Sequence, residues 1–392
     1  MRVLLISTYF VQYGIELANG LAEAGAEVGL VFNHENAVKL VGEDYRAMVS
    51  DKVQLKLMPK KHSASLIGRA FWVNRSWMKK TVREFQPDVL HMQAANDLAS
   101  LWTAWHNKDR LVVTIHDVNP HPGEDAKAVP FWLRFLTDRI IIPRTVKCGT
   151  RWICHGEILK KELARKYPLE LSNIDVVPHG ILEGYSSVDG AATSPEAQAE
   201  ADAKLDPANE LPPGPALFFG RMEHYKGLHV LADAIPLVVD KMPEAKFVIA
   251  GRGPALEPER EKLTAHPQVE LKDYYIETAE VAQLYRDASI NLAPYIEASQ
   301  SGVIASGYAF DVPAVASRLG ALPEVVIDEE NGLLVQPNNP QALADAILRI
   351  LQDNQLRAKL RAGVRRWAEG PLSWQSIAGK TLESYAQASR KK

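Results

Sequence analysis

The strongest constraint on the fold is an alternation of short apolar runs with amphipathic helical patterns. It occurs twice along the 392 residues. An apolar run at 3–7 precedes a helical pattern that ends near residue 24, and a second run follows at 28–32. This order is typical of a parallel βαβ unit. Because the chain is also long for one domain, we expect an α/β protein with two doubly wound, Rossmann-like halves and a ligand cleft between them.

The first half is predicted to continue with strands at 88–92, 111–115, 152–154 and 175–177 and helices at 97–105 and 157–167. A stretch poor in large apolar residues then predicts a linker with a weak, exposed helix. After it we expect strands at 216–219, 246–250, 269–271, 289–293 and 313–316, with helices at 227–241, after Pro254, at 278–287, 302–310, 340–353, 356–368 and 373–389. We therefore expect domains at 1–185 and 215–370, a linker at 186–214, and a C-terminal helix at 371–392 that packs back towards the first domain.

Composition excludes several classes of protein. The apolar content of 46% and charged content of 24% are those of a globular chain, and a net charge of −3 gives no support for nucleic-acid binding. The apolar run at the N-terminus is too short for a signal peptide, and no stretch approaches the ~18 apolar residues of a spanning helix. Cys148 and Cys154 lack the further ligands of a zinc site, so we expect them in the core of a cytoplasmic protein without a metal site.

Two cations follow the apolar run at 216–219. Gly220 ends this run, and Arg221 and Lys226 precede the next helical pattern. A helix N-terminus at the carboxyl end of a parallel strand favours anions, and ligands gather there in α/β proteins. We therefore predict a phosphate site, and the alternative is a solvated basic loop.

A second strand-to-helix turn lies at 293–303. Ser301, Gly302 and Val303 are placed to expose backbone N–H groups that suit phosphate or sugar hydroxyls. Glu297 lies in the same turn and could accept hydrogen bonds from sugar hydroxyls. The alternative for Glu297 is an acid that interacts with the helix dipole.

Two residues of the first half are candidates for ligand contact. Gly14 fits a turn before the first helix, where the backbone approaches a ligand, or it is a plain loop glycine. His116 directly follows the strand at 111–115, and its imidazole is expected at the ligand-binding edge of the sheet. The alternative for His116 is a satisfied structural residue.

Residues 52–83 contain nine Lys or Arg residues and no Asp or Glu. Aromatic residues alternate with these cations, including Phe71, Trp72 and Trp77. Such a segment suits an anionic membrane surface. The alternative is an ordinary helix that buries its aromatic residues and exposes its cations.

Several nucleotide-binding motifs are absent. In the stretch that begins at Gly251, Leu256 stands where a dinucleotide-binding fingerprint needs its third glycine. No P-loop and no D-x-D sequence is present. If a diphosphate is bound, Arg221 and Lys226 must supply the neutralising charge, with no cofactor and no metal.

Together these stretches resemble the retaining GT-B glycosyltransferases of family 4, closely over 216–370 and more loosely over 1–180. The residues that carry the resemblance are Gly220-Arg221-x4-Lys226-Gly227, 247–254 with its Gly251-x-Gly253-Pro254, Leu284-Tyr285-Arg286-Asp287-Ala288, Pro294-x2-Glu297, 313–317, 331–335 and Val177-Pro178-His179-Gly180.

The resemblance implies roles for particular residues. The donor diphosphate would lie on Arg221 and Lys226, and phosphate and donor sugar on the backbone at 301–303. His116 would lie near donor sugar and acceptor. The remaining implied contacts to the nucleotide sugar are Gly14, Gly251, the base contacts Tyr274, Tyr275 and Ile276, and the E-x7-E positions Glu297 and Ser306.

Three positions depart from the family pattern. Ser306 stands where the second acid of E-x7-E is expected, Glu297 is displaced by one position, and Tyr13 replaces the first glycine of a Gly-Gly pair. The second acid usually grips the ribose.

The resemblance implies a retaining, metal-independent hexosyltransferase. We expect a UDP-sugar donor, such as UDP-glucose, and a saccharide or lipid-linked saccharide acceptor in polysaccharide biosynthesis. The enzyme would be cytoplasmic, with peripheral attachment to the inner face of the plasma membrane. The alternatives are a sugar-nucleotide epimerase or phosphorylase of the same fold, and a non-catalytic sugar-nucleotide-binding scaffold.

Overall fold

The computed structural model describes residues 1–60, 69–93, 97–118, 135–182, 199, 201–206, 208–209, 211–298 and 300–389. Most of the predicted linker and part of the basic segment at 52–83 lie outside these residues. The chain divides into two compact units, Met1–Gly180 with Ser373–Lys392, and Ile181–Leu372.

The first unit is built on a parallel sheet. Its strands lie in the order β3 (Val53–Met58), β2 (Glu27–Asn33), β1 (Arg2–Ile6), β4 (Val89–Gln93), β5 (Leu111–Thr114), β6 (Arg151–Cys154) and β7 (Ile174–Val176). Val3 of β1 is in register with Val28 on one side and Val89 on the other. The chain thus winds outward from β1 in one direction and then from β4 in the other, which makes the sheet doubly wound.

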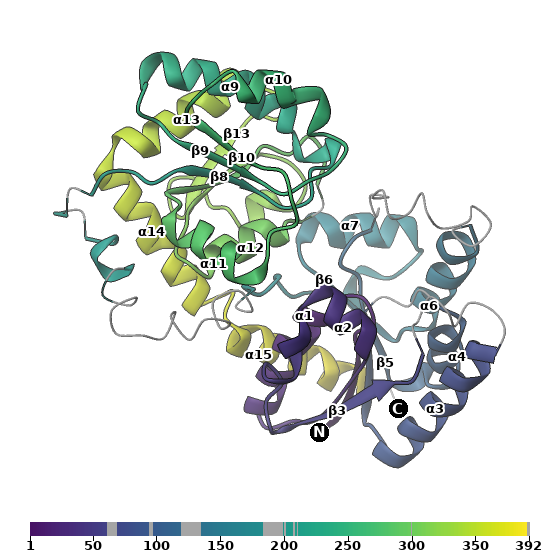
Figure 1. Ribbon diagram of the computed structural model, residues 1–392. Coiled ribbons are helices and arrows are strands. Elements are labelled where there is room, and N and C mark those ends of the chain that lie inside the picture. The colour runs from purple at the N-terminus through teal and green to yellow at the C-terminus, as the bar shows by residue number, and fades with distance from the viewer. Residues whose placement is uncertain are drawn as a thin grey trace. The chain divides into compact units, whose positions relative to one another are not determined.

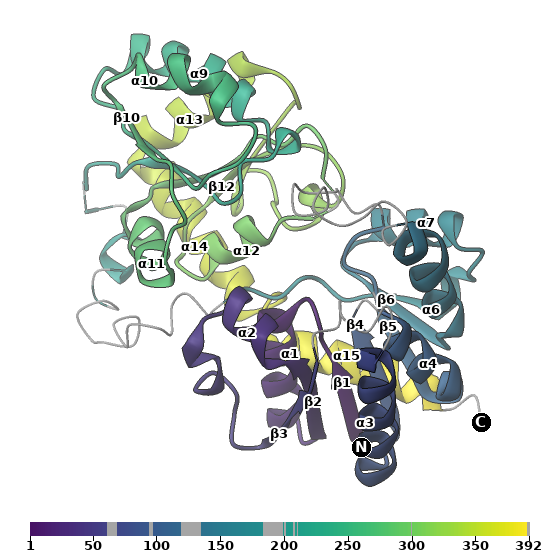
Figure 2. The ribbon, with the colours of Figure 1, turned by 45° about the vertical axis from the view of Figure 1, so that its right-hand side comes forward.

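Helices cover this sheet. They are α1 (Val11–Glu23), α2 (His34–Leu40), α3 (Arg69–Phe85), α4 (Leu98–His106), α6 (Ile142–Cys148), α7 (Glu157–Lys166) and α15 (Trp374–Ser389). The C-terminal helix α15, yellow in Figure 2, lies beside α1 and against β4, β5 and β6. Its Trp374 and Tyr385 therefore belong to the same core as Val3 and Leu5 of β1.

The second unit repeats the arrangement on a smaller scale. Its parallel strands lie in the order β10 (Val269–Lys272), β9 (Phe247–Ala250), β8 (Ala216–Phe219), β11 (Ile290–Ala293), β12 (Ala314–Ser317) and β13 (Gly332–Val335). The helices are α9 (Leu228–Lys241), α10 (Arg260–Thr264), α11 (Thr278–Asp287), α12 (Gly302–Tyr308), α13 (Pro340–Gln352) and α14 (Asn354–Glu369). Figure 1 shows α9 and α13 on one face of the sheet and α11 and α12 on the other.

The predicted α/β class and doubly wound architecture are confirmed, with differences at the sheet edges. The edge strands β3 and β13 were not predicted as strands; β3 was assigned to the basic segment, and β13 has only four residues. The helix expected after Pro254 is reduced to a 3-10 turn, Glu257–Glu259, and the five-residue α10. Cys148 and Cys154 are buried and unbridged, as predicted for core residues.

Within the described residues, no helix combines the length and the apolar character needed to cross a bilayer.

Candidate functional site

The two loops that carry most of the predicted site meet at the switch point of the second sheet. Strands β8 and β11 are neighbours, and the chain winds away from them in opposite directions. The loop after β8 carries the two cations, and the loop after β11 leads into α12. Ile296 N donates to Tyr225 O at 2.8 Å, and the rings of Tyr225 and Tyr295 lie edge to face at 5.8 Å. Ligands of open α/β sheets bind at this kind of crevice.

Two glycines make this close approach of loops possible. Gly227 has φ 73° and begins α9; a Cβ there would lie 1.9 Å from the carbonyl oxygen of Pro294. Gly220 has φ 105°, and a Cβ there would lie 2.8 Å from Nζ of Lys226. Residues with a side chain rarely adopt such φ values, so both positions favour glycine for conformation, and Gly227 also requires it for space. Gly251, after β9, lies against Gly220, since a Cβ on it would be 2.2 Å from Gly220 O.

Lys226 is a buried cation with little compensation from the protein. It is 7% exposed, and burial, with a smaller effect from Arg221, lowers the pKa of its ammonium to about 8. Among the described residues, its one hydrogen bond runs from Nζ to the carbonyl oxygen of Phe219 at 3.5 Å. An ammonium has three donors, so most of its capacity is left for a ligand. The alternative of a solvated basic loop is wrong for this residue.

Arg221 differs from Lys226 in exposure. Its side chain is 49% exposed, and Nε forms an ion pair with Glu223 Oε1 at 3.0 Å. The two cations and Glu223 leave one net positive charge in the loop. This net positive charge favours an anionic ligand.

The N-terminus of α12 supplies further donors. Ser301 caps the helix by accepting from Ile304 N, and the N–H groups of Gly302 and Val303, in the first turn, have no intrahelical acceptor. Ser306 is buried, and its hydroxyl donates to Gly302 O at 2.9 Å. Glu297 is exposed in the loop before the helix. Glu297 lies before the first turn of α12, which contains no acid, and both interpretations of Glu297 stay predictions.

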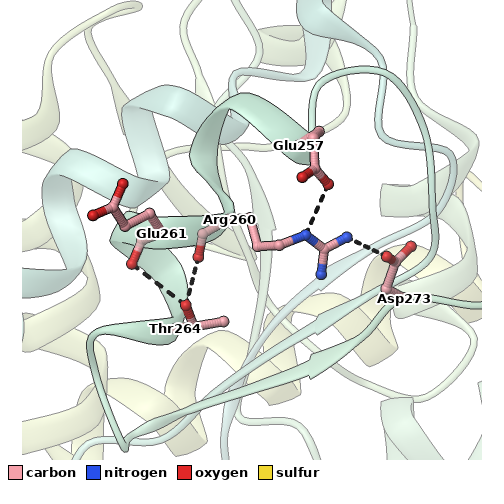
Figure 3. Close-up of polar contacts among 5 residues, drawn as sticks. All are labelled: Glu257, Arg260, Glu261, Thr264 and Asp273. Carbon is pink, nitrogen blue, oxygen red and sulfur yellow. Dashed lines mark hydrogen bonds and ion pairs between the residues drawn. The ribbon is translucent and has the colours of Figure 1, made fainter.

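The predicted base contacts lie in the loop after β10. Tyr275 is 70% exposed and Tyr274 is 45% exposed, whereas Ile276 is buried. Arg260 of α10 holds the start of this loop, because its guanidinium contacts both Asp273 and Glu257, as Figure 3 shows. Tyr274 is fixed by a 2.7 Å hydrogen bond from its hydroxyl to Glu280. The exposed ring of Tyr275 thus follows an anchored segment.

In the first unit, three adjacent strands are each followed by a histidine. His116 follows β5, His155 follows β6 and His179 follows β7, and all three imidazoles are buried. His116 Nδ1 lies 2.9 Å from His155 Nε2. Tyr13 of α1 contacts all three rings, and Phe10 stacks on His116 with ring centroids 3.7 Å apart.

Burial dominates the electrostatics of this cluster. It lowers the pKa of His155 to about 3 and that of His179 to about 4, and it lowers the pKa of His116 well below its usual value. The imidazoles are therefore neutral at pH 7. Sequence reasoning found His116 and missed His155, although the same signal, a histidine directly after a buried strand, marks both.

Gly14 lies inside α1, not in a turn before it as predicted. A Cβ at Gly14 would lie 2.5 Å from Cβ and Oγ of Ser7, which follows β1. The glycine thus allows the helix to pack closely on the chain segment after β1. Its predicted contact with the donor stays a prediction.

The described part of the basic segment forms β3 and α3. Helix α3 buries Asn74, Met78, Thr81, Val82 and Phe85, whereas Trp72 is 59% exposed. The alternative that this helix buries its aromatic residues is therefore wrong for Trp72.

A groove of about 680 Å³ lies between α3 and α4. The guanidinium of Arg75 stacks over Trp102 at 4.4 Å and over Trp72 at 5.3 Å. The other cationic side chains that line the groove are Lys79, Arg83 and Arg110.

Comparisons with known proteins give consistent results. The family described as "Glycosyltransferase Family 4" matches residues 11–182, and "Glycosyl transferases group 1" matches 215–353. The chain is 30% identical over 309 residues to the "Phosphatidyl-myo-inositol mannosyltransferase" of Mycobacterium leprae, which covers 76% of this chain and 73% of that protein.

A second relative is the "D-inositol 3-phosphate glycosyltransferase" of Xylanimonas cellulosilytica, 30% identical over 248 residues. The match covers 59% of this chain and 55% of the relative, so the chain spans about half of that relative's length. The solved structure of Alr3699/HepE from Anabaena, in complex with UDP and glucose, has a TM-score of 0.68 at 16% identity, over 98% of this chain and 99% of that chain. This last likeness concerns the fold.

Proposed function

The chain belongs to glycosyltransferase family 4, and from that premise we propose that it transfers a hexose from a UDP-sugar to a saccharide or lipid-linked saccharide acceptor. The observation that carries the proposal is Lys226. A buried, mostly uncompensated ammonium at the switch point of a parallel sheet is costly in the absence of a ligand. A diphosphate supplies the negative charge that the site lacks.

The donor would be held by the loops of the second unit. Lys226 and Arg221 bind the diphosphate, and the N–H groups of Gly302 and Val303 bind phosphate or donor-sugar oxygens. Tyr275 offers a ring on which a base can stack. Glu297 would accept hydrogen bonds from sugar hydroxyls, and Ser306 and Gly251 are the further donor contacts that the family resemblance implies. UDP is favoured because the similar fold of the Anabaena protein is solved with UDP and glucose.

The reaction that we propose proceeds with retention and without a metal. The bond between the anomeric carbon and the diphosphate oxygen breaks, and its electron pair leaves with UDP. The acceptor hydroxyl oxygen bonds to the anomeric carbon on the same face, and its proton passes to the departing phosphate. Lys226 and Arg221 stabilise the charge that develops on that phosphate. His116, in the first unit, would lie near the acceptor.

We also propose that the acceptor is reached at an anionic membrane surface, on the cytoplasmic side. Helix α3 presents the exposed Trp72 and a row of cations, a combination that suits the headgroup region. The relatives named above carry inositol phosphate or phosphatidylinositol in their names, which supports an anionic acceptor.

The first experiment is a thermal-shift screen of the full chain with UDP-, GDP- and ADP-sugars. The best donor raises the melting temperature through mass action. Product analysis then separates the alternatives. A disaccharide or glycolipid formed only with acceptor supports the proposal, and an epimer or sugar phosphate formed without it supports an epimerase or phosphorylase. If the Lys226→Ala variant keeps the full cellular function, the protein is a scaffold and the proposal fails.

A further inference from the structure

His116 is the last residue in a series of hydrogen bonds in which a backbone carbonyl decides which atoms donate and which accept. His155 Nδ1 lies 2.9 Å from the carbonyl oxygen of Val177. A carbonyl oxygen can only accept, so His155 Nδ1 carries the proton. In a neutral imidazole the other nitrogen is then an acceptor.

The second link transfers this constraint to His116. His155 Nε2, now an acceptor, lies 2.9 Å from His116 Nδ1, so His116 Nδ1 carries the proton and donates. The exposed fraction is 3% for His155 and 2% for His116, and such burial disfavours a charged ring. His116 Nε2 is therefore an unprotonated acceptor.

The third observation is that this acceptor is unused. His116 Nε2 is buried and has no hydrogen-bond partner among the described residues. The ring cannot easily rotate away, because Phe10 stacks on one face and Tyr13 meets it at 90° with centroids 4.8 Å apart. Buried polar atoms in native proteins are nearly always hydrogen-bonded, so we expect a ligand atom to pair with His116 Nε2.

We propose that His155 is a positioning residue that fixes the tautomer of His116, so that Nε2 accepts a hydrogen bond from a ligand hydroxyl. A neutral acceptor suits a sugar or alcohol O–H and repels a phosphate oxygen, which is itself an acceptor. His116 thus selects a hydroxyl group over a phosphate group in the ligand that it contacts. The identity of the ligand as a UDP-sugar rests on the proposed function, but the tautomer does not.

Two variants of His155 separate its positioning role from its packing. In the His155→Gln variant, the side-chain amide reaches the position of Nε2 and its oxygen can accept from His116 Nδ1. The His155→Asn variant can still donate to Val177 O but leaves His116 Nδ1 without an acceptor. We expect the Gln variant to keep kcat/KM within about threefold and the Asn variant to lose about 10- to 100-fold, because a buried donor loses its partner. The His91→Gln variant is the control for lost stability, because His91 is also a buried histidine but takes no part in the hydrogen bonds that link Val177, His155 and His116.

Nitrogen-15 spectra of histidine-labelled protein without ligand test the tautomer directly. We expect His116 with protonated Nδ1 and bare Nε2 in the wild type and the Gln variant, and a mixture of tautomers in the Asn variant. Protonated Nε2 in the wild type would overturn the inference, as would equal kcat/KM and equal spectra for the two variants. If the wild type turns over no UDP-sugar, the proposed function fails, and the spectra still decide the tautomer.

Discussion

Replacing Lys226 by methionine is expected to stabilise the ligand-free protein and to weaken UDP binding. The ammonium is 7% exposed, and burial lowers its pKa from an ordinary 10.5 to about 8. At 1.36 kcal/mol per pH unit, the charged form costs about 3 kcal/mol at pH 7. The Lys226→Met variant removes this cost at nearly equal volume. For a unit of this size, the melting temperature should rise by about 5–10 °C.

The same change should remove a charge-assisted hydrogen bond to the diphosphate. That bond is worth about 1.5–3 kcal/mol, so the Kd for UDP should rise about 10- to 100-fold. Differential scanning calorimetry without and with UDP measures both effects on one sample. Lys241→Met is the matched control, because Lys241 lies on α9 and is 54% exposed, with an ion pair to Asp345. Its melting temperature and UDP affinity should stay near those of the wild type.

Two results would refute the reasoning separately. A Lys226→Met variant less stable than the wild type would show that the ammonium is compensated in the ligand-free state. An unchanged Kd for UDP would show that the diphosphate does not bind at the loop after β8.

Three further predictions concern pH and membranes. The Kd for UDP, measured by calorimetric titration, should change little between about pH 7 and 8, where the UDP phosphates stay ionised. Above about pH 8 it should rise up to about tenfold per pH unit, because Lys226 loses its proton there. The pKa values of His155 and His179 are lower in the folded protein than in the unfolded chain, so the unfolded chain binds protons at a higher pH. The unfolding free energy should therefore decrease as the pH is lowered from 6.5. In urea titrations His155→Gln should reduce this loss by up to about 1.4 kcal/mol per pH unit down to about pH 3. Removing two cations of α3 with Lys79→Gln and Lys80→Gln should reduce sedimentation with anionic vesicles about 30-fold, at about 1 kcal/mol each, while equal binding of the wild type to neutral vesicles would contradict a membrane role.

The sequence predicts most of the fold because buried parallel strands appear as continuous apolar runs. Leu4 and Leu5 in β1 and Ile249 in β9 are fully buried, and such runs are hard to mistake. The edge strands lack this signal. In β3 only Val53 and Met58 are buried, and its lysine and glutamine made the stretch look like part of a surface segment.

The site was predicted less completely, because burial and strand order decide it. Arg221 and Lys226 look alike in the sequence, yet one is half exposed and the other is buried. Residues 116, 155 and 179 lie close together because β5, β6 and β7 are neighbours in the sheet. The order of strands along the chain does not show which strands are neighbours in the sheet. Gly14 was misplaced because a glycine near a helix start resembles a turn, whereas here it accommodates Ser7.

The position of α15 has a consequence for the order in which the protein can be built during translation. Tyr385 is fully buried in the first unit, and its hydroxyl lies 2.5 Å from His91 Nδ1 of β4. Trp374 packs on Tyr13 of α1. The second unit, in contrast, ends at Leu372. The first unit, whose strands are synthesised before those of the second, therefore cannot complete its core until α15 has been synthesised. The second unit can complete its fold before α15 is synthesised.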